Sequence, residues 1–208
     1  MKVQSSIIEN KYLRVRSINI GACLYEVYDK QKKINLILNL GSKKNYSNKN
    51  FYVGATCGRY AGRISNSRFK IKKKTYRLDG NEGRNTLHGG KIGFDRLEWK
   101  IHHHSKAKII YQLLSKNLDQ GFPGDLNSQC IFEIKNKSLF IKYQYKSNKL
   151  THVSLTNHSY WNLNKNKKET IFNHELKINS EKYLEVNNKL IPTGKFKQVQ
   201  NTINDSNK

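Results

Sequence analysis

Short segments of alternating apolar and polar residues recur along the chain, separated by clusters of Gly, Asn, Ser and Lys. Their apolar members are mainly Ile, Tyr and Phe, and a period of two residues is typical of strands with one buried face. No window of twelve residues carries an apolar stripe with the period of a helix. The clearest expected strands are residues 68–76, 107–114, 129–134 and 140–145.

Many short strands at near-regular spacing predict an all-β fold, either a sandwich or a barrel. The three lysines at 72–74 are expected to form a solvent-exposed hairpin turn. We find no internal repeat and no linker, so residues 1–208 are expected to form a single domain. The polar residues 197–208 are expected to form a frayed tail.

The charge of the chain is strongly basic, with 39 Lys and Arg against 15 Asp and Glu and a formal net charge of +24. This excess first suggests a nucleic-acid-binding β protein. However, only 8 of the basic residues are Arg, which phosphate recognition favours, and the charge is spread along the whole chain. We therefore expect a solvated surface and no dedicated nucleic-acid or membrane partner. The N-terminal residues lack the apolar region of a signal peptide.

The cysteines and the histidine tract give little sign of metal or redox chemistry. Cys23, Cys57 and Cys130 are widely spaced and contain no C-x-x-C pair, which favours a reducing, cytoplasmic compartment. The three histidines at 102–104 are consecutive, and consecutive residues of a strand point to opposite faces. We therefore expect no metal site there.

Two glycine-rich segments carry candidate binding residues. In residues 54–64, Arg59 and Arg63 lie four apart among small residues, without the Gly-Lys-Ser/Thr of a phosphate-binding loop. They either donate hydrogen bonds to a polar ligand or lie on the surface of a tight turn. In residues 85–90, His88 precedes two glycines and either approaches a ligand or has a structural role in a turn.

A third segment, residues 155–163, alternates polar and aromatic side chains around His158. Asn and His can hydrogen-bond sugar hydroxyls, aromatic rings can stack on a sugar, and His can exchange protons near neutral pH. The alternative is a buried aromatic strand end. Ser159 lacks the G-x-S-x-G context of a hydrolase nucleophile. Residues 121–126 read as a turn without chemistry.

Together, these segments resemble the aldose 1-epimerase (galactose mutarotase) family. The matching motifs, in chain order, are GRYAGRI at 58–64, NTLHGG at 85–90, GFDRLEW at 93–99, GFPGDL at 121–126, TNHSYWNL at 156–163 and LIPTG at 190–194. The resemblance covers the N-terminal and middle part of the family. It implies a large antiparallel β-sandwich of the galactose mutarotase type, incomplete at its C-terminal end.

The family interconverts the α- and β-anomers of hexoses such as glucose or galactose by acid/base ring opening, without a cofactor or a metal. By this resemblance His158 is the general acid and His88 is a second catalytic residue. Both histidines, together with Arg63, Ser159 and Tyr160, are expected to contact the sugar.

Two departures from the family pattern affect this expectation. Gly62 stands where the family has an Asn, so one side-chain contact is expected to be lost. The family's general-base Glu and a sugar-binding Asp belong to a segment beyond this sequence, so the general base is unknown. Glu82, Glu98 and Glu175 match no such motif. A positioned base typically contributes about 10²–10⁴ in rate.

The motifs and the departures leave three interpretations. The first is an aldose 1-epimerase whose small-molecule partner is a hexose. The second is a non-catalytic carbohydrate-binding remnant, or one half of a split epimerase that a C-terminal fragment complements. The third is the basic nucleic-acid-binding protein.

Overall fold

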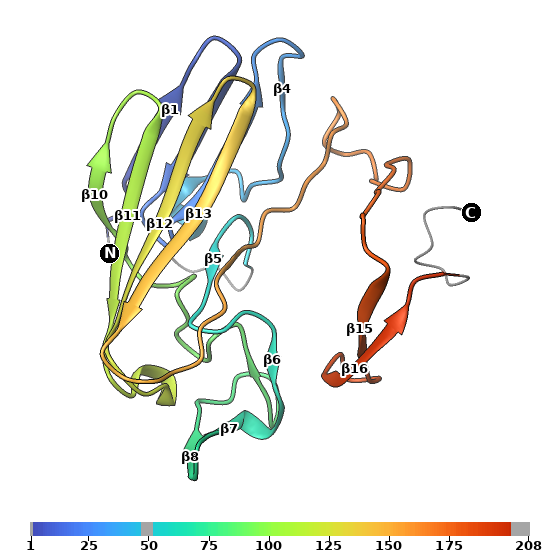
Figure 1. Ribbon diagram of the computed structural model, residues 1–208. Coiled ribbons are helices and arrows are strands. Elements are labelled where there is room, and N and C mark those ends of the chain that lie inside the picture. The colour runs from blue at the N-terminus through green and yellow to red at the C-terminus, as the bar shows by residue number, and fades with distance from the viewer. Residues whose placement is uncertain (1, 47–51, 201–208) are drawn as a thin grey trace.

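The body of the molecule is a sandwich of two four-stranded antiparallel sheets (Figure 1). The structure is a computed structural model that describes residues 2–46 and 52–200. The first sheet contains, in order, β1 (Ser5–Glu9), β2 (Leu13–Ile18), β3 (Cys23–Asp29) and β4 (Ile34–Asn35). The second contains β10 (Lys100–His104), β11 (Lys108–Ser115), β12 (Leu126–Lys135) and β13 (Ser138–Ser147). In both sheets, strands that are neighbours in space are also neighbours in sequence.

Four shorter pairs of strands complete the described fold. They are β5 (Thr56–Cys57) with β14 (Thr156–Asn157), β6 (Arg63–Ile64) with β9 (Thr86–Leu87), β7 (Arg68–Ile71) with β8 (Lys74–Arg77), and β15 (Lys182–Val186) with β16 (Pro192–Gln198). Three 3₁₀ helices lie between strands: η1 (Lys43–Tyr46), η2 (Ser65–Ser67) and η3 (Asp119–Gly121). The described residues contain no α-helix, so the all-β prediction is confirmed.

The expected strands at 107–114, 129–134 and 140–145 are confirmed as parts of β11, β12 and β13. The single strand expected over 68–76 is wrong, because this segment forms the hairpin of β7 and β8. The lysine run does form the turn, and Lys72 has a φ of +53°. Lys74 already belongs to β8, so the turn is shorter than the lysine run.

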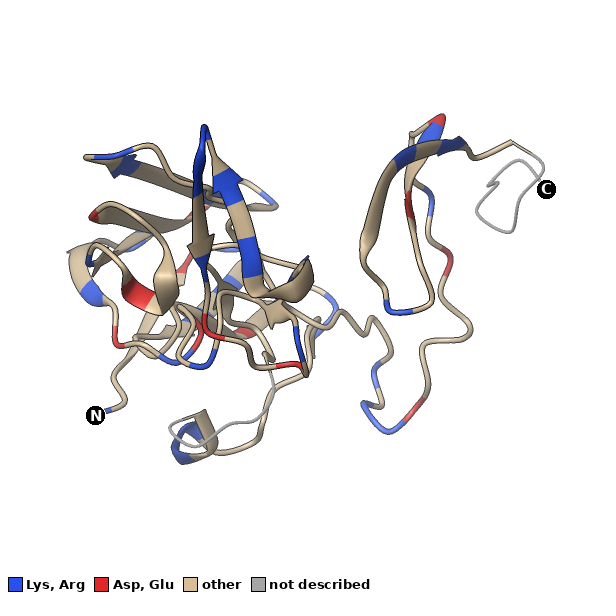
Figure 2. Cartoon of the chain, turned by 90° about the horizontal axis from the view of Figure 1, so that it is seen from below, with Lys and Arg blue, Asp and Glu red and all other residues tan. Residues whose placement is uncertain are grey.

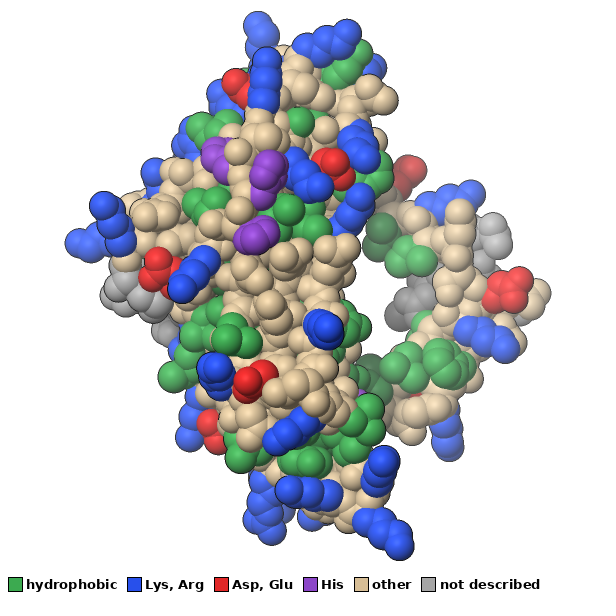
Figure 3. Space-filling model, turned by 60° about the vertical axis from the view of Figure 1, so that its left-hand side comes forward, with side chains coloured by type: hydrophobic (Ala, Val, Ile, Leu, Met, Phe, Trp, Pro, Cys, Tyr) green, Lys and Arg blue, Asp and Glu red, His purple; other side chains and the backbone are tan. Residues whose placement is uncertain are grey.

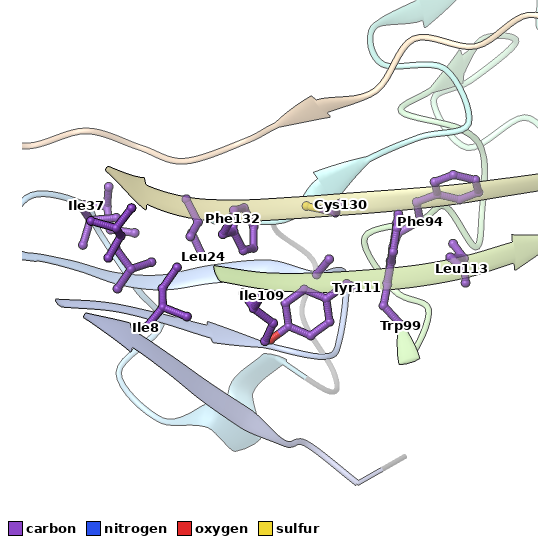
Figure 4. Packing of buried hydrophobic residues seen from close by; sticks show 14 of the residues in the cluster. Ile8, Leu24, Ile37, Phe94, Trp99, Ile109, Tyr111, Leu113, Cys130 and Phe132 are labelled. Atoms are coloured by element: carbon purple, nitrogen blue, oxygen red, sulfur yellow. The ribbon is translucent and has the colours of Figure 1, made fainter. Parts of the chain in front are cut away.

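The core lies between the facing sheets, where alternate residues of strands such as β2 and β11 are buried (Figure 4). Ile109, Tyr111 and Leu113 of β11 and Phe132 of β12 pack in one buried cluster with Leu24 of β3. Burying such a side chain contributes about 1.5–3 kcal/mol. The Tyr111 hydroxyl keeps a polar partner, since it lies 2.8 Å from the hydroxyl of Ser17. This core holds the two four-stranded sheets together.

The C-terminal arm, residues 163–200, stands apart from the sandwich and ends in the β15–β16 hairpin (Figures 1 and 3). Its large apolar side chains are exposed, with Phe172 at 93%, Leu176 at 81% and Phe196 at 70%. The strand β16 extends two residues into the expected tail, and residues 201–208 lie outside the described part of the chain. The edge strand β13 pairs only with β12 among the described strands. The described fold therefore exposes both apolar surface and an unpaired strand edge.

Basic residues lie on the sheets, the connecting loops and the arm, interspersed with acidic and neutral ones (Figures 2 and 3). Among the described residues, no helix is long and apolar enough to cross a lipid bilayer.

Candidate active site

Two short strand pairs bring together histidines from separate sequence motifs. β5 pairs with β14 and β6 pairs with β9. His158 follows β14 directly, and His88 follows β9 directly. Their ring centroids lie 5.3 Å apart with the ring planes at 89°. The structure thus places the two histidines that the sequence singled out in one site.

The main chain around His158 is fixed against the segment that leads into β5. The N–H of His158 donates to the carbonyl of Ala55 at 2.8 Å, and its own carbonyl accepts from the N–H of Gly54 at 2.9 Å. Gly54 has a φ of +71°, and a Cβ there would lie 2.0 Å from the carbonyl oxygen of Leu24. Only glycine fits this close approach. The position of His158 therefore depends on the glycine-rich segment.

His88 is held in one tautomer by a backbone hydrogen bond. Its Nδ1 accepts from the N–H of Gly62 at 3.1 Å, so the neutral ring carries its proton on Nε2. Burial, reinforced by the charges of His158 and Arg63, lowers the pKa of His88 to about 4. At neutral pH His88 is therefore an uncharged donor. Gly62, expected only to lose a side-chain contact, contributes its backbone N–H to the site.

Tyr52 contributes a third ring to the site, and no sequence motif predicted it. Its ring centroid lies 4.6 Å from that of His88 and 5.7 Å from that of His158. Burial raises the pKa of its hydroxyl, so the phenol stays neutral. The only sequence signal was an aromatic residue two positions before Gly54. Tyr52, His88 and His158 form a cluster of three mutually contacting rings.

Arg63 is held by a carboxylate from a neighbouring turn. Its Nε lies 2.6 Å from Oε2 of Glu82, and its Nη2 lies 2.7 Å from Oε1. This hydrogen-bonded pair raises the pKa of Arg63. Arg63 is partly exposed, as a residue that binds a ligand needs to be. The charges of both members reach His88 and affect its pKa.

Arg59 has a different role from Arg63 and matches neither expectation for the glycine-rich segment. Its residue surface is only 2% exposed. Its guanidinium donates to the carbonyls of Pro123, Gly124, Ser115 and Lys116 and to the Ser115 hydroxyl. Its donors are therefore used inside the protein, so Arg59 is a structural residue. Burial lowers the pKa of Arg59.

Ser159 and Tyr160 continue the chain beyond His158. The Ser159 hydroxyl donates to Oδ1 of Asn157 at 2.6 Å, and Nδ2 of Asn157 donates to the carbonyl of Gly54 at 2.9 Å. The Tyr160 ring is 5.1 Å from the His158 ring and is 44% exposed. Ser159 therefore belongs to a network that stabilises the loop, and Tyr160 offers an accessible aromatic surface.

The three glutamates that match no general-base motif of the family supply no free base beside the histidines. Glu82 is paired with Arg63, Glu98 accepts from Nδ2 of Asn19 at 3.1 Å, and Glu175 lies on the exposed arm. Within residues 2–46 and 52–200, no group of three or more His, Cys, Asp or Glu could hold a metal. The ring of His104 instead hydrogen-bonds the carbonyl of Ile7.

The two facing sheets form an all-β sandwich of the galactose mutarotase type, and this fold carries the cluster of three rings. The family model described as aldose 1-epimerase matches residues 4–208, and the chain belongs to this family. It is 34% identical to galactose mutarotase of Sus scrofa over 209 residues, which cover 99% of this chain and 61% of that protein. It is 35% identical to aldose 1-epimerase of Haemophilus influenzae, covering 91% of this chain and 56% of that one.

Solved structures show the same fold. The GalM/aldose epimerase homologue from C. elegans superposes with a TM-score of 0.90 at 28% identity, covering 97% of this chain and 63% of that one. Galactose 1-epimerase from Lactobacillus acidophilus superposes with a TM-score of 0.86 at 27% identity, covering 100% of this chain and 66% of that one. The chain thus spans about three fifths of the length of the curated relatives that it matches.

Proposed function

We propose that this chain binds a hexose such as galactose or glucose and interconverts its anomers. The observation that carries the proposal is the pair of perpendicular imidazoles, His88 and His158, beside the arginine Arg63. A neutral sugar needs hydrogen-bond donors and a proton source, and this cluster holds both. The names and folds of the relatives support the same reaction.

In the proposed reaction, His158 protonates the ring oxygen of the sugar while a base removes the proton from the anomeric hydroxyl. The bond between C1 and the ring oxygen breaks, the C1–C2 bond rotates, and the ring closes on the other face. His88 donates through Nε2 to the ring oxygen or a hydroxyl, and Arg63 steadies a second hydroxyl. Ser159 and Tyr160 border the bound sugar. No described residue is assigned as the base.

The test follows the optical rotation of freshly dissolved α-D-galactose and α-D-glucose with purified protein. We expect faster mutarotation than in buffer and loss of the increase in His158→Ala. His103→Ala is the matched control, because His103 lies on the exposed strand β10. Equal rates for wild type, His158→Ala and buffer would exclude catalysis by this chain alone.

The second candidate function is sugar binding without turnover, or activity only with a complementing polypeptide. The specific observation that favours it is the edge of β13 that no described strand pairs with, together with the exposed apolar arm. The test adds the part of Haemophilus influenzae aldose 1-epimerase that this chain does not match. A complex in size-exclusion chromatography with a raised rate supports complementation. Two separate peaks and an unchanged rate count against it.

A cytoplasmic location is also part of the proposal. Cys23, Cys57 and Cys130 are buried thiols, and a reducing compartment keeps cysteines in this state. Burial raises the pKa of Cys130 to about 12, so this thiol is inert.

A further inference from the structure

The carboxylate of Glu82 lies between the motifs GRYAGRI and NTLHGG and binds Arg63 at two points. Both oxygens take part, at 2.6 Å from Nε and 2.7 Å from Nη2. This two-point geometry fixes the plane of the guanidinium as well as its position. A single contact would leave the group free to rotate.

Glu82 is itself rigidly placed. Its N–H donates to the carbonyl of Asn85 at 3.1 Å, and its carbonyl accepts from the N–H of Asn85 at 3.0 Å. The preceding residue, Asn81, binds the backbone of Leu87 through both oxygen and nitrogen of its amide. Leu87 directly precedes His88. The turn that carries Glu82 is therefore tied to the strand end that carries the histidine.

The orientation leaves one guanidinium nitrogen for a ligand. Nε and Nη2 are directed at Glu82, and no atom of the described residues accepts from Nη1 of Arg63. The positive charge lies close enough to lower the pKa of His88, and Tyr52 lies close enough to raise the pKa of Arg63. Pairing with Glu82 also offsets this charge, which suits an uncharged sugar.

From this geometry we infer that Glu82 is a positioning residue, which orients Arg63 so that Nη1 faces the sugar bound at the histidine cluster. This role rests on the proposed sugar-binding function. Glu82 does not touch the sugar in this assignment and is not the missing base, because both of its oxygens are used by Arg63.

The test compares wild type with Glu82→Gln, Glu82→Asp and the control Glu175→Gln, an identical change on the exposed arm. The orientation of Arg63 is read from its Nε–H signal by ¹⁵N NMR, which Arg63→Lys assigns among the 8 arginines. Binding is read by titration with D-galactose. The pKa of His88 is read from its ring proton signals.

We expect Glu82→Gln to shift and broaden the Arg63 signal and to raise the dissociation constant for D-galactose by at least about tenfold. It also removes a charge that raises the pKa of His88, so that pKa falls further. Glu82→Asp keeps the charge but is one methylene too short for the two-point contact. It should therefore weaken galactose binding and leave the pKa of His88 near its wild-type value.

Two results would overturn the inference in different ways. If wild type binds galactose and both Glu82 variants bind it equally well despite a disturbed Arg63 signal, the ion pair is only structural. If wild type gives no response to D-galactose or D-glucose, the proposed function fails for this chain, and the positioning role fails with it. Should Glu82→Gln not fold, Glu82→Asp and Arg63→Lys provide the same comparison.

Discussion

Gly89 lies directly against the carbonyl group of Gly58. A Cβ at Gly89 would stand 1.9 Å from that oxygen and 2.6 Å from the nitrogen of Arg59, and the φ of Gly89 is +97°. The contact joins the segment after His88 to the segment that carries the two arginines. The glycines at 58 and 89 therefore allow the backbones of the two glycine-rich motifs to pack directly against each other.

The first prediction concerns this contact. Gly89→Ala should lower the free energy of unfolding by about 3 kcal/mol or more, because both the steric overlap and the positive φ oppose a side chain. Urea denaturation measures the change. The control is Gly83→Ala, where φ is +58° but no atom lies within 4 Å of the added Cβ. For Gly83→Ala we expect the free energy of unfolding to fall by only about 1–2 kcal/mol, from the backbone strain alone. Equal losses at both positions would contradict the steric argument.

The second prediction separates the two arginines of one motif. Arg59→Met leaves four carbonyls without their donor and should cost at least about 3 kcal/mol of stability. Arg63→Met breaks a partly exposed ion pair and should cost about 1 kcal/mol or less. Urea denaturation of both variants tests this order. For sugar binding we expect the opposite order. Arg63→Met should weaken binding more than an Arg59 variant that folds, such as Arg59→Lys.

The third prediction is a pH dependence of stability. The pKa of His88 is about 4 in the fold against about 6.5 in an unfolded chain, so the unfolded state binds its proton more readily between these values. The contribution of His88 to stability is therefore complete above pH 6.5 and is lost as the pH falls toward 4. Urea midpoints across this range should fall less steeply in His88→Gln than in the control His103→Gln. Parallel curves would contradict the low pKa.

The fourth prediction tests the third ring of the cluster. Tyr52→Ala opens the site to water, and since burial is the main cause of the low pKa of His88, that pKa should rise toward 6.5. Tyr52→Phe keeps the ring and should leave the pKa near 4. NMR titration of the His88 ring measures both. A rise in Tyr52→Phe as large as in Tyr52→Ala would show that the hydroxyl, and not the ring, is responsible.

The sequence predicted the strands best where one face of the sheet is buried. In β11 the alternation of Ile109, Tyr111 and Leu113 reflects the packing directly. The pairing of His88 with His158 followed only from the family resemblance, because no local pattern tells which strand ends meet. Tyr52 and Glu82 were beyond prediction, since their roles arise from contacts across the fold. Arg59 was expected at a ligand or on the surface of a tight turn. Two of its carbonyl partners, Pro123 and Gly124, come from a turn to which the sequence assigned no chemistry.

The edge of β13, which no strand in residues 2–46 and 52–200 covers, has a consequence for the behaviour of the chain in solution. A ten-residue edge strand is a template on which a second copy can add. Lys142 and Lys146 lie on this strand, and the formal net charge of +24 makes two copies repel each other. Salt screens such repulsion to a range of about 8 Å at 0.15 M. The colloidal stability of the chain should therefore decrease as ionic strength rises, because the repulsion between these charges keeps the copies apart.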